Sequence, residues 1–343
     1  MSAPDWLALP DLASRRLGGG VVGTNDELFA AADNLVTPEP PGFTPRTFGP
    51  KGQVYDGWET RRRRTPGEDW AIVRLGAAGV VRGLVVDTSF FTGNYPPAAS
   101  VHGCRLDGHP SLDELSAADW VPLVTHGALE GDTANMFFSS QAGLITHVKL
   151  VIHPDGGVAR LRVHGEVVPD PTRFPDGWLD LAAVENGGRV VGCSDLFYGS
   201  PAQLVEPGLA RTMGEGWETR RRRDAGNDWV VVRLAAPGRL RLAELDTSHF
   251  KGNAPGAASL RGVDERKADP ADEAAWRDLL PRTDLRPDTR HRFVLRTDPV
   301  THVRLDIHPD GGMARLRLHG HLDDGVLDTL RAAWDRSAGR AGN

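Results

Sequence analysis

Short runs of apolar residues, separated by glycine and proline, recur along the whole chain. Residues 70–75 and 229–234 are short runs with β-branched side chains, and a glycine or proline follows each run within a few positions. Such runs are typical of β-strands. In residues 147–153, Val148, Leu150 and Ile152 alternate with His147, Lys149 and His153. This period of two predicts a strand with one buried face.

A Pro-Asp-Gly-Gly sequence at residues 154–157 predicts a tight turn after that strand. Because residues 158–164 alternate again, we expect 147–153 and 158–164 to form a β-hairpin. Like charges that face each other in a ladder are unfavourable, so we expect solvent, a subunit interface or an anionic group to cover the basic face. That face would carry His147, Lys149, His153, Arg160, Arg162 and His164.

Helix signals are few. The segments that begin at Ser111 and at Pro270 each predict a short helix, at equivalent places in the two halves of the chain. Apolar residues at helical spacing from Asp323 onward predict a C-terminal helical tail. Helices therefore supplement a fold that is built mainly from strands.

The chain contains an internal duplication. Residues 57–64 recur at 216–223, and residues 146–157 recur at 301–312. Gly23 to Asp26 pair in the same way with Gly192 to Asp195, and the first copy is longer than the second in the Pro/Gly-rich stretch 37–52. Self-similarity on this scale indicates two copies of one ancestral domain.

Many short strands in two copies predict an all-β protein of two tandem homologous jelly-roll β-sandwich domains. The predicted domains are residues 1–170 and 171–343, and the second includes the helical tail. A length of 343 residues with 40% hydrophobic content agrees with two cores of this size.

Composition limits the kinds of binding partner and the cellular compartment that we expect. A formal net charge of −6 argues against nucleic acid as a partner. The sequence shows neither a signal peptide nor a membrane span, so we expect no membrane contact. Cys104 and Cys193 have no counterparts in the opposite copies, which argues against a disulfide framework and favours the cytoplasm.

The arginine run is the first candidate for chemistry, because GxSxG, HExxH and P-loop motifs are all missing from the sequence. An extended segment at 59–64 would carry arginine on both faces. These guanidinium groups either pair with Asp69, Asp87 or Asp155 or grip a substrate carboxylate through a bidentate fork. The candidates are Arg61, Arg63, Arg220 and Arg222.

Polar residues crowd two further segments, 87–94 and 246–253, each of which follows an apolar strand. They either organise a Gly-Asn turn or line a site. The copies differ here, since Phe90 and Thr92 stand where the second copy has His249 and Lys251. The candidates are Asp87, Thr88, Asn94, Asp246, His249 and Asn253, and His153 and His308 join them because each precedes a Pro-Asp-Gly-Gly turn at the rim of a sheet.

These motifs, which occur twice and in the same order, resemble the allantoicase family over residues 17–320. The resemblance implies galactose-binding-like jelly rolls and no nucleotide cofactor. It also implies hydrolysis of allantoate to ureidoglycolate and urea in the purine degradation that passes through allantoin. Family members often carry tyrosine where His153 and His308 stand, which argues against an obligatory catalytic histidine.

Allantoate carries two ureido groups on one carbon, so its cleavage breaks an aminal C–N bond and requires no serine or cysteine nucleophile. We expect arginines to hold the carboxylate and ureido oxygens. Proton transfer would fall to Glu59 or Asp87, or to the equivalent Glu218 or Asp246. A divalent metal such as manganese is compatible with the Asp and His content, although no ligand spacing demands one.

Two other interpretations remain open at this stage. The chain would be a non-catalytic β-sandwich that binds carbohydrate or a small anion, since fold alone does not define function. Alternatively, the second copy would serve only as a structural partner in a homo-oligomer. We favour the first copy as the principal site, because the 37–52 insertion offers a loop that could close over a ligand.

Overall fold

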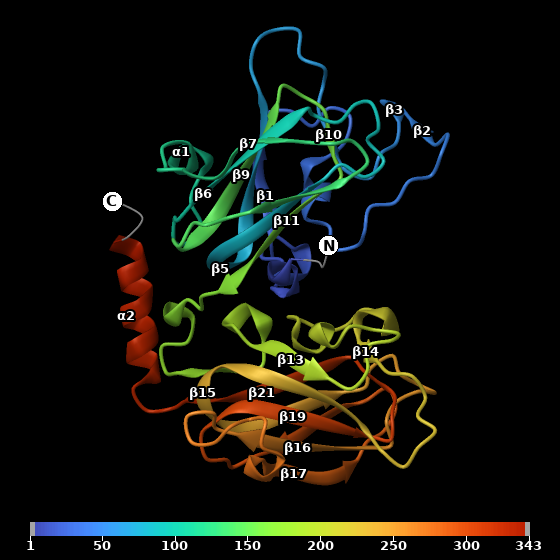
Figure 1. The fold of residues 1–343 in the computed structure, drawn as a ribbon, viewed down its shortest axis with the longest axis vertical. Coiled ribbons are helices and arrows are strands. Elements are labelled where there is room, and N and C mark those ends of the chain that lie inside the picture. The colour runs from blue at the N-terminus through green and yellow to red at the C-terminus, as the bar shows by residue number, and fades with distance from the viewer. Residues whose placement is uncertain (1–3, 340–343) are drawn as a thin grey trace. The chain divides into compact units, whose positions relative to one another are not determined.

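The computed structural model describes residues 4–339, and strands dominate it (Figure 1). The chain forms two compact units, with residues up to Val168 in one and Pro169–Trp334 in the other, which we call the first and second copy. Within the described residues the α-helices are α1 (Leu112–Ser116) and α2 (Val326–Gly339). No described helix is long and apolar enough to cross a membrane.

One long strand organises the first copy. β5 (Asp69–Asp87) spans 19 residues, and its early part pairs with β1 and β9, whereas its late part pairs with β8 and β11. β6 and β7 extend the sheet beyond β9. The partner strands are β1 (Gly20–Thr24), β6 (Ala98–Cys104), β7 (Val121–Ala128), β8 (Ala134–Phe138), β9 (Ile145–His153) and β11 (Arg160–Val167). β5 therefore belongs to both layers of a sandwich.

Glycine allows β5 to pass between the layers. The pairing of β5 with β9 shifts register between Arg74 and Gly79. A Cβ atom at Gly79 would lie only 2.5 Å from the carbonyl oxygen of Glu166, and one at the equivalent Gly238 would lie 2.8 Å from that of His321. Only glycine permits this close approach of two strands.

The second copy repeats this topology around β15 (Asp228–Asp246), which pairs with β13 and β19 early and with β18 and β21 late. The surrounding strands are β12 (Trp178–Asp180), β13 (Arg189–Cys193), β16 (Ala257–Val263), β17 (Arg277–Asp284), β18 (Arg290–Val294), β19 (Val300–His308) and β21 (Arg315–Leu322). The prediction of two tandem β-sandwiches is confirmed.

The predicted hairpin of residues 147–153 and 158–164 is wrong. β9 pairs with β5 and β6, and β11 pairs with the late part of β5, so the two strands lie in different layers. The predicted apolar residues Val148, Leu150 and Leu161 are completely buried, but His147 and Arg160, which were expected on the exposed basic face, are each only 1% exposed. A pattern within one strand carries no information about which other strands it pairs with.

One predicted helix is also wrong. The segment from Ser111 forms α1, where Ser111 and Glu114 make a reciprocal capping box. The segment from Pro270 forms only a 3₁₀ turn at Glu273–Ala275 before β17 begins. Asp272 caps that turn, but no glutamate returns the bond. The C-terminal helix is present as α2.

The insertion in the first copy covers part of the predicted basic face. The guanidinium group of Arg160 donates to the carbonyl oxygens of Glu39 and Asp56, both at 3.1 Å, and that of Arg162 donates to the carbonyl oxygen of Thr37 at 2.6 Å. The Asp56 carboxylate lies 2.8 Å from Arg160. Main-chain oxygens and carboxylates of the same chain thus neutralise this face.

Candidate active site

Glu59 projects from a short ladder at the end of the sandwich. β4 (Trp58–Glu59) pairs with β10 (Gly157–Val158), which places Glu59 opposite Gly157. On either side, Trp58 and Thr60 point into the core with 0% and 4% exposure. Glu59 and Arg61 alternate with them and therefore lie on the opposite side of the segment.

The second and third positions of the Asp-Gly-Gly turn bring β10 close to the core. Gly156 has a φ of +143°, a conformation that other residues rarely adopt. A Cβ atom at Gly157 would lie 2.0 Å from the ring of Phe91. The glycine pair therefore fixes β10, and through it the main chain of Glu59. Gly311, Gly312 and Phe250 repeat the arrangement in the second copy.

Asn94 orients the Glu59 carboxylate. Its Nδ2 donates to Glu59 Oε1 at 2.7 Å, and Asn253 Nδ2 donates to Glu218 Oε1 at 2.6 Å in the second copy. Burial raises the pKa of Glu59, and the hydrogen bond from Asn94 opposes this rise in part. Both copies thus contain a carboxylate–amide pair. The sequence analysis had named the four residues as candidates but had not paired them.

Arg61 is held at one edge only. Its Nε donates to Asp26 Oδ2 at 2.6 Å, and its amide donates to Asp26 Oδ1 at 3.1 Å. Arg220 and Asp195 repeat both contacts, at 2.8 and 3.1 Å. Within residues 4–339, the terminal nitrogens of Arg61 make no hydrogen bond to the protein. These nitrogens remain available for an anion.

Arg63 is paired with carboxylates through both its side chain and its main chain. Its guanidinium group lies 2.5 Å from Asp69 Oδ1, and its amide donates to Asp155 Oδ2 at 2.8 Å. In the second copy, Arg222 lies 2.7 Å from Asp228 and also contacts Asp224. Pairing with Asp69, Asp87 or Asp155 was one of the two alternatives for the arginine run, and of these three the Arg63 guanidinium group pairs with Asp69.

Asp87 and Asp246 organise the turns that follow them. Each Oδ1 accepts a hydrogen bond of 2.8 Å from the amide of the serine two residues later. The hydroxyl of the fully buried Thr88 donates to the carbonyl oxygen of Glu130 at 2.5 Å. These contacts support the interpretation that Asp87 and Thr88 organise the turn. The turn in turn positions Phe91 and Asn94 at the site.

His153 belongs to a separate polar cluster on the outer face of β6 and β9. Its Nδ1 lies 2.9 Å from Glu68 Oε1, its Nε2 lies 2.8 Å from Ser100 Oγ, and its ring centre lies 4.8 Å from that of His126. In the second copy His308 lies 3.3 Å from Ser259 Oγ. These contacts are made outside the Glu59–Asn94 pair.

The copies differ beside this pair. Phe43 of the insertion stacks on Phe90 and on Tyr55, with ring centres 5.7 and 5.4 Å apart, and Tyr55 stacks on Phe91 at 4.9 Å. In the second copy His249 stands in place of Phe90, and its Nε2 lies 3.0 Å from the carbonyl oxygen of Ala210. The first copy thus has an aromatic wall where the second has a polar contact.

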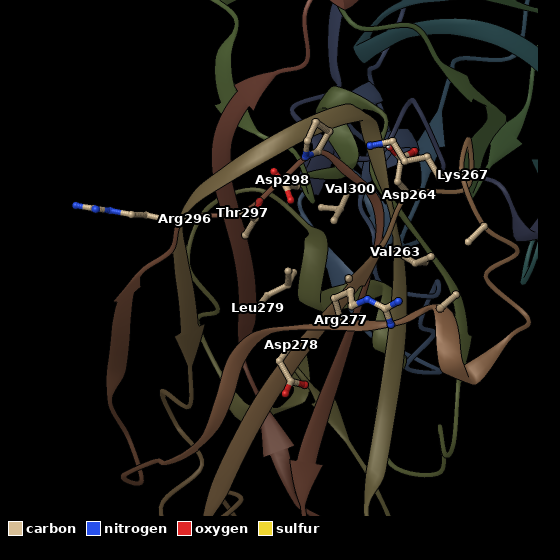
Figure 2. A pocket seen from close by; sticks show the side chains of 14 residues that line it. Val263, Asp264, Lys267, Arg277, Asp278, Leu279, Arg296, Thr297, Asp298 and Val300 are labelled. Carbon is tan, nitrogen blue, oxygen red and sulfur yellow. Dashed lines mark ion pairs between the residues drawn. The ribbon is translucent and has the colours of Figure 1, made fainter.

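A cavity of about 420 Å³ lies elsewhere in the second copy (Figure 2). Val263 and Val300 line it at one end of β16 and β19, whereas Ala257 and His308 pair at the other end, on the side of Glu218. Asp264 in its wall is already paired with Arg266 at 2.8 Å. The cavity is therefore distinct from the carboxylate–amide pair.

The arrangement around Glu59 offers two chemical abilities. A half-buried carboxyl group whose pKa is raised by burial is suited to donate and accept protons. A guanidinium group with two unoccupied nitrogens is suited to bind a carboxylate. In residues 4–339, no group of three or more His, Cys, Asp or Glu side chains is arranged to hold a metal ion.

Fold and site together define a class of protein: a duplicated jelly-roll sandwich that carries a carboxylate–amide pair and an exposed, aspartate-held arginine in each copy. A family model described as the allantoicase repeat matches residues 10–168 and 179–323. The chain belongs to the allantoicase family.

Individual relatives agree with this assignment along the whole chain. A probable allantoicase of Nocardia farcinica is 58% identical, covering 92% of this chain and 95% of its own length. One of Streptomyces coelicolor is 51% identical, covering 96% and 90%. The crystal structure of allantoicase from Saccharomyces cerevisiae superposes with a TM-score of 0.77 at 34% identity, covering 91% of this chain and 93% of that one.

Two residues of the site escaped the sequence analysis. Asp26 and Asp195 hold Arg61 and Arg220, but they had served only to align the two copies. A signal was present, because Gly23 and Asp26 recur as Gly192 and Asp195 while the two residues between them differ in the two copies. Retention between copies would have marked the aspartate as a candidate.

Proposed function

We propose that the chain catalyses the hydrolysis of allantoate to ureidoglycolate and urea. The observation that carries this proposal is the Glu59–Asn94 pair beside Arg61, present twice in a member of the allantoicase family. The amide-held carboxyl group and the exposed arginine together supply a proton-transfer group and an anion-binding group, which favours catalysis on an anionic substrate over carbohydrate binding.

Arg61 binds the substrate carboxylate in this proposal. Its two terminal nitrogens match the spacing of two carboxylate oxygens. The side chain is 64% exposed, so a ligand can reach it. Arg220 is held in the same way in the second copy, with its guanidinium group 5.2 Å from the ring centre of Phe197.

Glu59 moves the protons. In its protonated form it donates a proton to one ureido nitrogen while the bond from that nitrogen to the central carbon breaks, and urea leaves with the bonding electrons. The nitrogen of the remaining ureido group supplies an electron pair to the central carbon, which gives a protonated N-acyl imine. Water adds to this carbon and returns a proton to Glu59, so that ureidoglycolate forms and the carboxyl group is regenerated.

The first copy is the principal site in this account. Its stacked rings of Phe43, Tyr55 and Phe90 offer apolar surface on the turn that carries Asn94, and apolar surface against a bound substrate would strengthen electrostatic contacts there. Glu218 and Asn253 make the second copy a further site of the same kind. We assign Asp87, Asp246 and Thr88 to the support of the turns, and Arg63 and Arg222 to the support of the arginine segment.

The assay of urea tests the function directly. Purified protein should release urea from allantoate and none from allantoin, measured across neutral pH with and without added manganese. Release without added manganese would show that no exogenous metal is needed. No urea from allantoate under either condition would contradict the proposed function.

We further propose a cytoplasmic homo-oligomer. Cys104 and Cys193 are both free thiols, which agrees with a reducing compartment. Burial raises the pKa of the Cys104 thiol to about 12, so this group is unreactive at neutral pH. Sedimentation of the purified protein measures the assembly state.

A further inference from the structure

We propose that Asp26 and Asp195 are positioning residues for substrate binding: each holds an arginine by its Nε edge so that the opposite edge grips the substrate carboxylate. The inference rests on the proposed function and assigns the carboxylate-binding part of that site to a specific pair in each copy. The aspartates do not contact the substrate themselves.

The first copy shows a carboxylate whose two oxygens are both committed. Asp26 Oδ1 accepts from the amides of Leu28 and Arg61 at 3.0 and 3.1 Å, and Oδ2 accepts from Arg61 Nε at 2.6 Å. The Asp26 side chain is only 9% exposed, whereas that of Arg61 is 64% exposed. A nearly buried group thus fixes an arginine that points outward.

The second copy reproduces each contact. Asp195 Oδ1 accepts from the amides of Phe197 and Arg220 at 3.0 and 3.1 Å, and Oδ2 accepts from Arg220 Nε at 2.8 Å. The exposed fractions are 9% for Asp195 and 65% for Arg220. Neighbouring residues differ between the copies, yet the geometry of this pair is the same.

The same aspartate also locates the proton-transfer group. The carbonyl oxygen of Asp26 accepts from the indole of Trp58 at 2.8 Å, and that of Asp195 accepts from the indole of Trp217 at 2.8 Å. Trp58 directly precedes Glu59. Asp26 therefore contacts both Arg61 and the residue that precedes Glu59, and Asp195 does the same in the second copy.

Fixing Nε has a defined consequence for binding. A free arginine side chain loses rotamer freedom when it grips a ligand, and a preorganised one has already lost it. Burial alone would raise the pKa of Asp26, but hydrogen bonds from Leu28 and Arg61 lower it overall, so the carboxylate is ionised at neutral pH. An ionised partner holds the guanidinium group more firmly than a neutral amide can.

The test combines Asp26→Asn with Asp195→Asn in the full chain and measures KM and kcat for allantoate together with the melting temperature. We expect KM to rise roughly tenfold, as for one lost charge-assisted hydrogen bond, while kcat stays within about twofold of wild type. The matched control is Glu166→Gln, which breaks the exposed Arg82–Glu166 pair of 3.0 Å and should leave KM unchanged.

A second pair of variants separates positioning from general stability. In a background of Arg61→Lys and Arg220→Lys, which lacks Nε, the two Asp→Asn changes should not raise KM further. An unchanged KM in the Asp26→Asn, Asp195→Asn variant of an active enzyme would overturn the inference alone. An equal further rise in the lysine background would also overturn it. Absence of urea release by the wild-type protein would overturn both the inference and the proposed function.

Discussion

The amide nitrogen of Asn94 lies 2.7 Å from the carboxylate of Glu59, although the two residues are 35 positions apart in the sequence. Asn253 and Glu218 reproduce this contact at 2.6 Å with the same separation. The turn built on Thr88 and the ladder between β4 and β10 bring the two segments together. The account of catalysis depends on this pair, and the predictions begin with it.

Replacing Asn94 with alanine removes a hydrogen bond that favours the ionised form of Glu59. The pKa of Glu59 should then rise further, because burial acts without opposition. The alkaline limb of kcat, which reports loss of the protonated acid, should move to higher pH, and kcat should fall about tenfold through misorientation. The measurement is kcat against pH in a Glu218→Gln background, and an unmoved alkaline limb would refute the role of Asn94.

The two copies should differ in their share of the activity. Glu59→Gln should lower kcat at the first site by roughly 10²-fold or more and leave the activity of the second site unchanged. Glu218→Gln should leave most of the total activity intact. Steady-state kinetics of both single variants, each with an unchanged melting temperature, provides the comparison. If Glu218→Gln removes most of the activity instead, the second copy is the principal site.

Loss of Arg63 should lower stability. Asp69 has a side chain only 2% exposed, and without Arg63 its charge would be left largely uncompensated. Since Arg63 itself is partly exposed, we expect Arg63→Ala to lower the free energy of unfolding by about 3 kcal/mol. Urea denaturation measures it. Arg64→Ala serves as the control, because this exposed side chain makes no ion pair within the described residues, and equal losses in the two variants would disprove the assignment.

Acid should destabilise the first copy partly through His147. Burial, and next the charge of Arg74, lower the pKa of His147 from 6.5 to about 4. A depressed folded-state pKa means that stability is fully present above pH 6.5 and is lost as the pH falls toward 4. His147→Gln should therefore reduce the loss of unfolding free energy over this range by roughly 2 kcal/mol, measured by denaturant titration at several pH values. An identical acid dependence in the variant would contradict this origin.

The sequence predicted where the main strands lie but not all of the strands with which they pair. Alternation in β9 and β11 predicted the burial of Val148, Leu150 and Leu161, but it placed His147 and Arg160 on an exposed face, and both are buried. The pairing of both strands with β5 depends on a register shift near Gly79, which links layers across many residues. No local pattern encodes that pairing, and the adjacent Pro-Asp-Gly-Gly turn favoured a hairpin instead.

The sequence likewise identified candidate residues but not the contacts between them. Glu59, Asn94 and Arg61 were all predicted, yet only the fold joins Asn94 to Glu59 and Asp26 to Arg61. The insertion at 37–52 was expected to be a lid. Part of its main chain satisfies Arg160 and Arg162, and only Phe43 packs near the turn of the first copy.

The central claim is that Glu59 and Glu218 transfer the protons in allantoate cleavage. The most direct measurement compares urea release by the wild-type protein with that of the Glu59→Gln, Glu218→Gln double variant, after circular dichroism has shown that the variant is folded. The account predicts one urea and one ureidoglycolate per allantoate for the wild type, and a rate at least about 10²-fold lower for the variant. A folded double variant that releases urea at the wild-type rate would contradict it.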